Sequence, residues 1–453
     1  MLISVAGMSG TGFCGAVQHG GGEGGALSQW WNGKYVTGDW FGVRGDLSDR
    51  GIEFKGKWEG VYCGVVDSQR GARGFFDQEL AFDAKVDVEK LTGSDAARGW
   101  SAFGGGRWRD SRASANPNSF VEGNPIFNPA RFQSGVQWRL THFGLGYVSP
   151  EMFGVKEFLS CKGGWLQPQK DFLVQPLSLL FTNLVICSSK GLSYNMPWSS
   201  SLSTWGGSLQ VKPMESAYIK GGLYMACPQI ASSGNHGLAF AGYAQDPSLN
   251  GLLTMVEAGW TPSLGASRLP GKYAVGGYYH GVKAVSFDAE ETASGVYGFY
   301  FQADQMLYRE PAAIKEGGSG CGKSFKAPVG GAANCDQGLS MFNLLTFAPP
   351  ETNLMTFYFQ SGLVYKGLIP GRDSDQAMCA IAYGNYSSDR IDVLQKCGVS
   401  NQANFTALIE AGYRIELNHW AFVQPYVQYL IHPNGTDTVA NATVLGFMAG
   451  LAF

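Results

Sequence analysis

Alternation of apolar and polar residues over the last fifty residues constrains the fold of this chain more than any other feature. Residues 405–417 read FTALIEAGYRIEL, in which one parity is apolar and the other carries Thr406, Glu410, Arg414 and Glu416. A period of two residues is the pattern of a β-strand with one apolar face and one polar face. Residues 420–431 and 441–453 repeat this pattern, so the tail predicts three consecutive strands.

The length of these strands favours a membrane-spanning barrel. Each covers about 12 residues, whereas strands of soluble proteins cluster near 5–6 residues. A strand tilted across a bilayer needs roughly 9–11 residues, with apolar side chains toward lipid and polar ones toward the lumen. The terminal aromatic, Phe453, fits a barrel whose last strand closes on its first. A large soluble β-sandwich is the alternative that strand length disfavours.

Thirteen earlier segments alternate in the same way, although the second half of one of them, 136–148, is ambiguous. They are 52–65, 78–91, 100–110, 136–148, 157–167, 204–211, 216–226, 252–261, 272–281, 298–309, 340–348, 353–365 and 376–386. With the three terminal strands the total is sixteen, and single-chain bacterial barrels have an even number of strands. We therefore predict an all-β fold, a 16-stranded antiparallel transmembrane β-barrel over residues 52–453.

Two segments precede the barrel. Residues 1–36 are predicted to be a lead-in, and their apolar, Gly-rich start is compatible with the remnant of a secretion signal. Residues 37–51 predict a short periplasmic helix. It would run over 40–50, after a possible N-cap at Asp39 and before Gly51, with Trp40 and Phe41 on one face.

The connections between strands nearly alternate in length, as short periplasmic turns and long outer loops should. Residues 111–135 and 168–203 are long outer connections and are the expected narrowing elements of a channel. The segment 310–339 breaks the rule, because it is long yet falls on the periplasmic side. It is either an insertion, carrying a possible Cys321–Cys335 disulfide or two free thiols, or the sign of a missed strand pair.

Composition and motifs exclude several classes of function. The 33 basic and 36 acidic residues nearly balance, which argues against a nucleic-acid partner. No run of about 18 apolar residues occurs, so we predict no transmembrane helix. The histidines lack metal-ligand spacing, GSGCGKS at 318–324 does not match a phosphate loop, and GxSxG is absent. We predict no cofactor, no metal and no enzymatic activity.

Two alternatives stay open. An outer-membrane barrel enzyme, such as a phospholipase, would need a Ser–His pair on adjacent strands, for which Ser101 and His142 are the candidates. A soluble sugar-binding β-protein would need the outward apolar faces to be covered.

Several segments resemble the carbohydrate-selective porin family of bacterial outer membranes, the OprB type. They include TGDWFGVRGDLSDRGI at 37–52, KGGWLQPQKDF at 162–172, WGGSLQVKP at 205–213, GLVYKGLIPGRDSDQ at 362–376 and EAGYRIELNHWAFVQPYVQYLIHPNGT at 410–436. The resemblance covers nearly the whole chain in scattered blocks. It implies a sixteen-stranded channel in the outer membrane of a Gram-negative bacterium, for passive diffusion of small, glucose-like sugars. Its partners would be these sugars and outer-membrane lipid, and the chain would be a monomer or a homotrimer.

A sugar crosses a narrow pore by exchanging hydrogen bonds with water for weak ones with side chains, which requires forked donors and carboxylate or amide acceptors. The polar parity of the strands supplies such residues, and we favour the three arginines among them. The predicted pore-lining residues are Arg107, Arg109, Arg139, Asp83, Lys85, Lys162, Glu257, Asp304, Glu410, Arg414, Gln424 and Gln428. Arg112, Glu122 and Arg131 are weaker candidates, in a loop that would have to fold inward.

Overall fold

The computed structural model describes most of the chain. The described residues are 26–111, 117–121, 127, 129–132, 135–188, 194–196, 202–227, 230, 232–241, 250–288, 292–293, 295–311, 337–399, 404–435 and 438–453. The cysteine pair Cys321 and Cys335 and the weaker site candidates Arg112 and Glu122 lie outside these residues.

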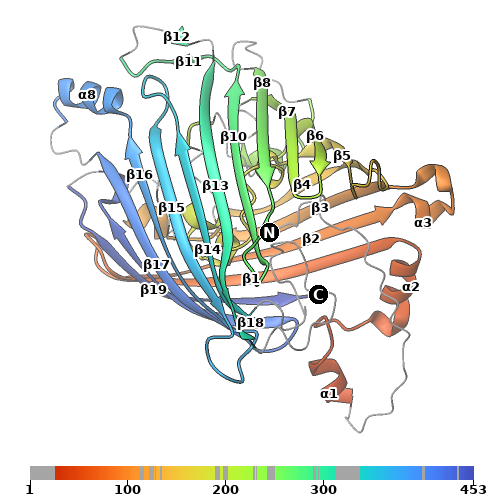
Figure 1. Ribbon diagram of the computed structural model, residues 1–453. Coiled ribbons are helices and arrows are strands. Elements are labelled where there is room, and N and C mark those ends of the chain that lie inside the picture. The colour runs from red at the N-terminus through yellow and green to blue at the C-terminus, as the bar shows by residue number, and fades with distance from the viewer. Residues whose placement is uncertain are drawn as a thin grey trace.

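Sixteen strands form one closed antiparallel barrel, which confirms the predicted fold (Figure 1). Each barrel strand pairs with the next along the chain. The first strand, β1 (Ile52–Asp67), also pairs with the last, β19 (Ala442–Ala452), in a register that starts with Lys57 opposite Ala452. Closure pairs the backbone groups that an edge strand would leave open, as hydrocarbon surroundings require.

Between these two lie the other fourteen barrel strands. They are β2 (Arg73–Asp87), β3 (Trp100–Ser111), β4 (Gly135–Val148), β5 (Leu159–Leu166), β6 (Thr204–Met214), β7 (Ala217–Ala226), β8 (Gly251–Trp260), β10 (Leu269–His280), β13 (Val296–Arg309), β14 (Gly338–Phe347), β15 (Met355–Lys366), β16 (Gln376–Tyr386), β17 (Phe405–Glu416) and β18 (Ala421–Ile431). Two-residue strands form β9 (Ser263–Leu264), beside β10, and the separate hairpin of β11 (Ala284–Val285) and β12 (Thr292–Ala293).

The helical elements are short and lie in the connections. They are α1 (Ala26–Trp31), η1 (Trp40–Gly42), α2 (Val43–Asp49), α3 (Val88–Thr92), η2 (Asp95–Ala97), α4 (Pro117–Val121), η4 (Pro168–Lys170), η5 (Ser178–Leu180), α5 (Leu184–Cys187), η7 (Ser233–Asn235), α8 (Ser388–Lys396) and η10 (Pro433–Gly435). Among the described residues, none of these helices has the length and apolar character needed to cross a membrane.

Burial along the strands follows the predicted parity. In β18, Gln424 and Gln428 are fully buried, whereas Val427 and Tyr429 are 39% and 41% exposed. In β17, Ile409 is exposed and Glu410 is buried. The polar parity therefore faces the barrel interior and the apolar parity faces outward, an arrangement that suits a lipid environment.

The tryptophans of the barrel strands and turns occupy two different settings. Trp108 and Trp138 are exposed on the outer face. Trp420 is instead buried, because the rings of Trp30 and Trp31 lie 4.9 and 5.6 Å from its own ring. The N-terminal segment thus covers part of the turn between β17 and β18.

Three local expectations need correction. The strand predicted over 78–91 ends at Asp87, whose side chain accepts a hydrogen bond from the Lys90 amide and so caps α3. The helix predicted over 40–50 is regular only from Val43 to Asp49. Trp40 and Phe41 have left-handed φ values of 52° and 59°, so they do not share a face of a regular helix.

A β-bulge explains the ambiguous second half of 136–148. Gly106 pairs with Leu140 and Gly105 with His142, so Thr141 is the extra residue in β4. The bulge exchanges the two faces of the strand. Before it the even-numbered Trp138 is exposed on the outer face, and after it the odd-numbered Leu145 is.

The long connection at 310–339 joins two strands that pair directly, β13 and β14. Arg309 lies opposite Gly338, so among the described residues no further barrel strand separates β13 from β14. Helices α1, α2 and α3 lie at one end of the barrel, and α8 and the β11–β12 hairpin lie at the other (Figure 1). The first end carries most of the short turns and corresponds to the periplasmic end of bacterial barrels.

Candidate functional site

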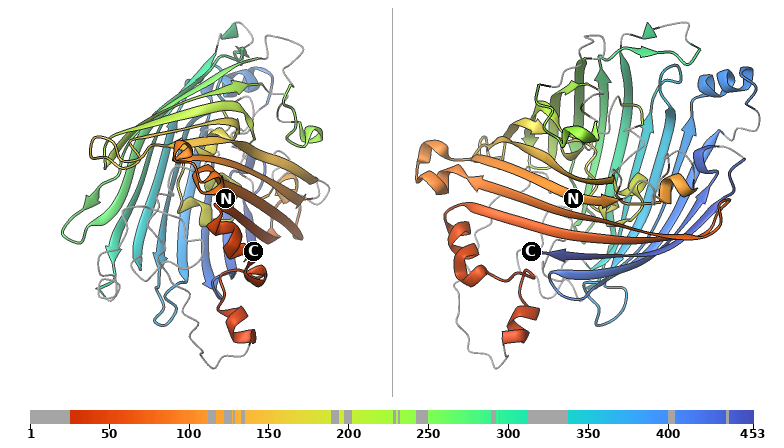
Figure 2. Two further views of the ribbon diagram at one scale, coloured as in Figure 1. Left: turned by 90° about the vertical axis from the view of Figure 1, so that its right-hand side faces the viewer. Right: turned by 180° about the vertical axis from the view of Figure 1, so that it is seen from behind.

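A loop between β5 and β6 folds into the barrel interior. We call its residues 167–188 the inner loop; it contains η4, η5 and α5, which lie within the ring of strands (Figure 2). Its side chains Phe181, Val185 and Ile186 are fully buried, and the Phe181 ring lies 5.5 Å from that of Phe342 on β14. The inner loop therefore packs against the inside of the wall.

Glu410 on β17 holds the end of the inner loop. Its carboxylate accepts hydrogen bonds from the Thr182 amide at 2.6 Å, the Thr182 hydroxyl at 2.7 Å and the Asn183 amide at 2.8 Å. Asn183 in turn donates to Gln428 at 3.1 Å and caps α5 by accepting from the Val185 amide. Hydrogen bonds to a charged group each contribute about 1.5–3 kcal/mol, so this is a strong anchor.

Further wall side chains hold the middle of the inner loop through its backbone. Lys272 on β10 donates to the Val174 carbonyl at 2.8 Å. Gln424 on β18 donates to the Leu180 carbonyl at 2.9 Å. These anchors satisfy backbone groups that would otherwise be buried without partners.

The start of the inner loop is held by Asp171. Its carboxylate forms an ion pair with Lys162 and accepts a hydrogen bond from the Tyr224 hydroxyl at 2.6 Å. Lys220 donates to the Asp171 carbonyl at 2.5 Å and pairs with Glu257 at 3.2 Å. These anchors come from strands all around the barrel: β5, β7, β10, β17 and β18.

A second connection, between β3 and β4, also reaches inward. Arg131 donates to the carbonyls of Leu179 (3.1 Å) and Phe181, and its Nε lies 3.6 Å from a carboxylate oxygen of Glu59 on β1. Phe127 is fully buried, with its ring 6.1 Å from that of Tyr358 on β15. Arg131 therefore joins the two inward connections to the β1 wall.

The inner face of β1–β3 carries a ladder of paired charges. Glu79 accepts from Arg109 at 2.5 Å, and Arg107 lies 3.6 Å from the same carboxylate oxygen. Lys57 pairs with Glu59 at 2.7 Å. The side chains of Arg107 and Arg109 keep 15% and 18% of their surface exposed. These groups can exchange hydrogen bonds with a solute inside the barrel.

The structure brings the three predicted arginines together. Arg107 lies opposite Arg139 in the β3–β4 register, and Arg109 is two residues further along β3. Arg139 also donates to the Ser232 carbonyl at 3.0 Å. Arg139 lies beside the ladder, but its guanidinium is bonded to the β7–β8 connection. It is therefore less available to a solute than Arg107 and Arg109.

The other predicted residues face the interior in two different settings. Asp83 lies 3.5 Å from the His142 ring, and Lys85 lies between Glu53 and Phe103 in the sheet register. Arg414 pairs with Glu416 at 2.6 Å. A second group is covered or bonded by the inner loop rather than exposed in the lumen: Lys162, Glu257, Glu410, Gln424 and Gln428. Asp304 is fully buried opposite Lys272.

Sequence reasoning missed Glu79, which accepts a hydrogen bond from Arg109 and forms an ion pair with Arg107, and Asp171, which fixes the start of the inner loop. Glu79 shares the parity of Asp83 and Lys85, so the alternation of β2 could have identified it. Asp171 lies in an irregular segment, where no periodicity indicates which way a side chain points.

Lys170 places a titratable group of the inner loop near the ladder. Burial lowers the pKa of Lys170 to about 7. The positive charges of Arg107 and Lys162 act in the same direction, while Asp83 opposes them. The charge of this ammonium therefore changes near neutral pH.

The geometry does not assemble the Ser–His pair that a barrel enzyme would need. Ser101 lies opposite Gly146, whereas His142 lies opposite Gly105. His142 is buried on the inner side, where its ring contacts Thr141 and Asp83, and it does not face lipid.

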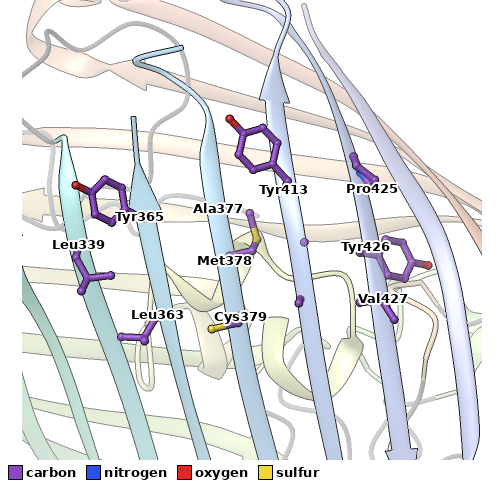
Figure 3. Close-up of a pocket in the computed structure, with 12 residues that line it drawn as sticks. Leu339, Leu363, Tyr365, Ala377, Met378, Cys379, Tyr413, Pro425, Tyr426 and Val427 are labelled. Carbon is purple, nitrogen blue, oxygen red and sulfur yellow. The ribbon is translucent and has the colours of Figure 1, made fainter. Parts of the chain in front are cut away.

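A groove of about 600 Å³ lies on the wall formed by β14–β18 (Figure 3). Its lining is mainly apolar and includes the exposed side chains of Leu363, Cys379 and Val427. Because these side chains belong to the outward parity, the groove is separate from the charged interior.

Comparison with known proteins agrees with this architecture. The family model "Carbohydrate-selective porin, OprB family" matches residues 76–453. Porin B of Pseudomonas aeruginosa is 28% identical over 452 residues, which cover 93% of this chain and 92% of that protein.

Two solved structures have similar folds. The high-pH structure of Pseudomonas putida OprB has a TM-score of 0.77 and 22% identity, covering 93% of this chain and 99% of that chain. The low-pH structure has a TM-score of 0.53 and 18% identity, with the same coverage. Since the family model spans most of the chain, this protein belongs to the carbohydrate-selective porin family, OprB, and lies in the bacterial outer membrane.

Proposed function

We propose that the protein admits small neutral sugars, glucose-like monosaccharides, between the inner loop and the charged wall of β1–β4. The observation that carries this proposal is the Glu79–Arg107–Arg109 cluster, which is paired yet partly exposed. The inner loop narrows the barrel, because wall side chains on β10, β17 and β18 hold it inside the ring of strands.

The chemistry of the ladder suits a sugar better than an ion. Guanidinium groups donate and carboxylates accept, so neighbouring hydroxyls of a sugar find both kinds of partner. Because Arg107 and Arg109 are already paired with Glu79, the local charge is partly balanced and no single ion is held tightly. Passage requires binding that is weak enough for the solute to leave again.

Liposome swelling tests this function. Reconstituted protein should admit glucose faster than a disaccharide, and faster than a monosaccharide-sized anion. Swelling in glucose no faster than that of protein-free liposomes would remove the channel proposal.

The double variant Arg107→Ala/Arg109→Ala tests the location of the narrow section. Removing both guanidinium groups widens the passage and removes donors, so the swelling rate should rise and the preference for glucose over a disaccharide should fall. Arg98→Ala is the control, because Arg98 is paired with Glu89 at an exposed periplasmic turn. Equal rates and preferences in both variants would place the narrow section elsewhere.

Each barrel encloses its own interior, so this pathway is compatible with either a monomer or a homotrimer.

A further inference from the structure

Two turns near the periplasmic end present a phenylalanine in the same unusual way. Phe41 has φ 59° and is 109% exposed, and Phe153 has φ 55° and is 83% exposed. Each is followed by a glycine that is also left-handed, Gly42 (φ 93°) and Gly154 (φ 76°). We call these two Phe-Gly pairs the aromatic apexes.

A positive φ is unfavourable for a bulky side chain. A phenyl ring that is fully exposed to water also contributes no hydrophobic stabilisation to the fold. In the first apex the preceding residue, Trp40, is left-handed as well. The chain therefore adopts a strained turn whose result is to project an aromatic ring away from the protein. Such a ring needs an apolar environment outside the described chain.

Each apex lies beside a second aromatic residue close to a strand end. The Trp40 ring is 6.5 Å from that of Phe54, which is exposed on the outer face of β1. The Phe153 ring is 5.2 Å from that of Phe158, just before β5. The first apex thus adjoins the outer face of β1, and the second lies in the β4–β5 turn, at the same end of the antiparallel strands.

One positively charged group, Arg44, lies beside the first apex. The Arg44 guanidinium stacks on Tyr35 at 3.6 Å and on Trp40 at 4.5 Å. An aromatic ring beside a cation suits the headgroup region of a bilayer, where one side is apolar and the other is wet and carries phosphates.

We propose that the two aromatic apexes insert into the periplasmic leaflet of the outer membrane and anchor the N-terminal segment and the β4–β5 turn to phospholipid. A lipid surface fits better than a protein partner. The apexes come from separate turns at the same end of the strands and share only an exposed ring, and the first adjoins the lipid-facing wall.

Photocrosslinking tests this proposal on the full-length protein. A benzophenone amino acid replaces Phe41 or Phe153, and the protein is irradiated both in native outer membranes and in phospholipid vesicles. Val275, exposed on the outer wall, is the positive control, and Val285, in the hairpin at the other end, is the negative control. Heat-modifiable migration on a gel verifies that each variant folds.

Phospholipid adducts at positions 41 and 153 in yields similar to that at 275, and several times that at 285, are the expected result. Adducts to another protein or to a second copy of this chain would overturn the lipid assignment. Lipid adducts at 275 with none at 41 and 153 would overturn it as well. Glucose swelling should be unchanged in these variants, so a failure here is distinguishable from a failure of the proposed sugar pathway.

Discussion

Lys170 gives the interior a charge that depends on pH. Its pKa is lowered to about 7, so the ammonium is mostly protonated at pH 6 and mostly neutral at pH 8. Raising the pH through this range removes one positive charge near Arg107, and ion selectivity should move toward cations. The reversal potential in a salt gradient, measured across a planar bilayer, checks the direction.

Lys170→Met provides the control, because methionine keeps an unbranched stem and lacks the ammonium. Its reversal potential should vary less between pH 6 and pH 8 and should resemble that of the parent protein at the higher pH. A pH dependence as large as that of the parent would assign the titration to another group.

At the scale of single elements, Glu410 should determine how firmly the inner loop is held. Glu410→Ala removes the acceptor of the Thr182 amide, the Thr182 hydroxyl and the Asn183 amide. The strand ladder is unaffected, so the barrel should persist while the inner loop gains freedom. Single-channel conductance should rise and become noisier, and Glu410→Gln, which keeps a carbonyl acceptor, should be intermediate.

Glu416→Ala is the matched control for this prediction. Glu416 lies on the same strand and pairs with Arg414, but the side-chain hydrogen bonds and ion pairs described for it do not involve the inner loop. A conductance equal to that of the parent in both variants would show that Glu410 does not position the loop.

Strands could be predicted from the sequence because their signal is local. The alternation of β17 and β18 needs only a dozen neighbouring residues, and the β4 bulge coincides with the start of the ambiguous second half of 136–148. The inner loop could not be placed in this way. Glu410 and Thr182 are 228 residues apart, and a carboxylate on the lumen parity looks the same whether it faces water or holds a loop.

At the scale of the whole molecule, the inside–outside division of the wall was predictable, whereas the filling of the interior was not. Gln424 and Gln428 were correctly placed on the inner parity, but both are fully buried. Their burial comes from the inner loop and the 127–132 segment, whose path depends on the closed barrel around them. Sequence reasoning therefore identified the wall of the barrel more reliably than the segments that fill its interior.

The same division predicts how stability depends on depth in the bilayer. Val427 lies in the middle of β18, faces outward and is 39% exposed, whereas Val423 is two residues from the strand's first residue. An arginine on the lipid face costs about 2–4 kcal/mol at the bilayer midplane and about 0–1 kcal/mol near the interfaces. Val427→Arg should therefore lower the free energy of unfolding in lipid vesicles well below that of Val423→Arg. Equal losses would show that the β18 outer face does not cross the hydrocarbon with Val427 at its centre.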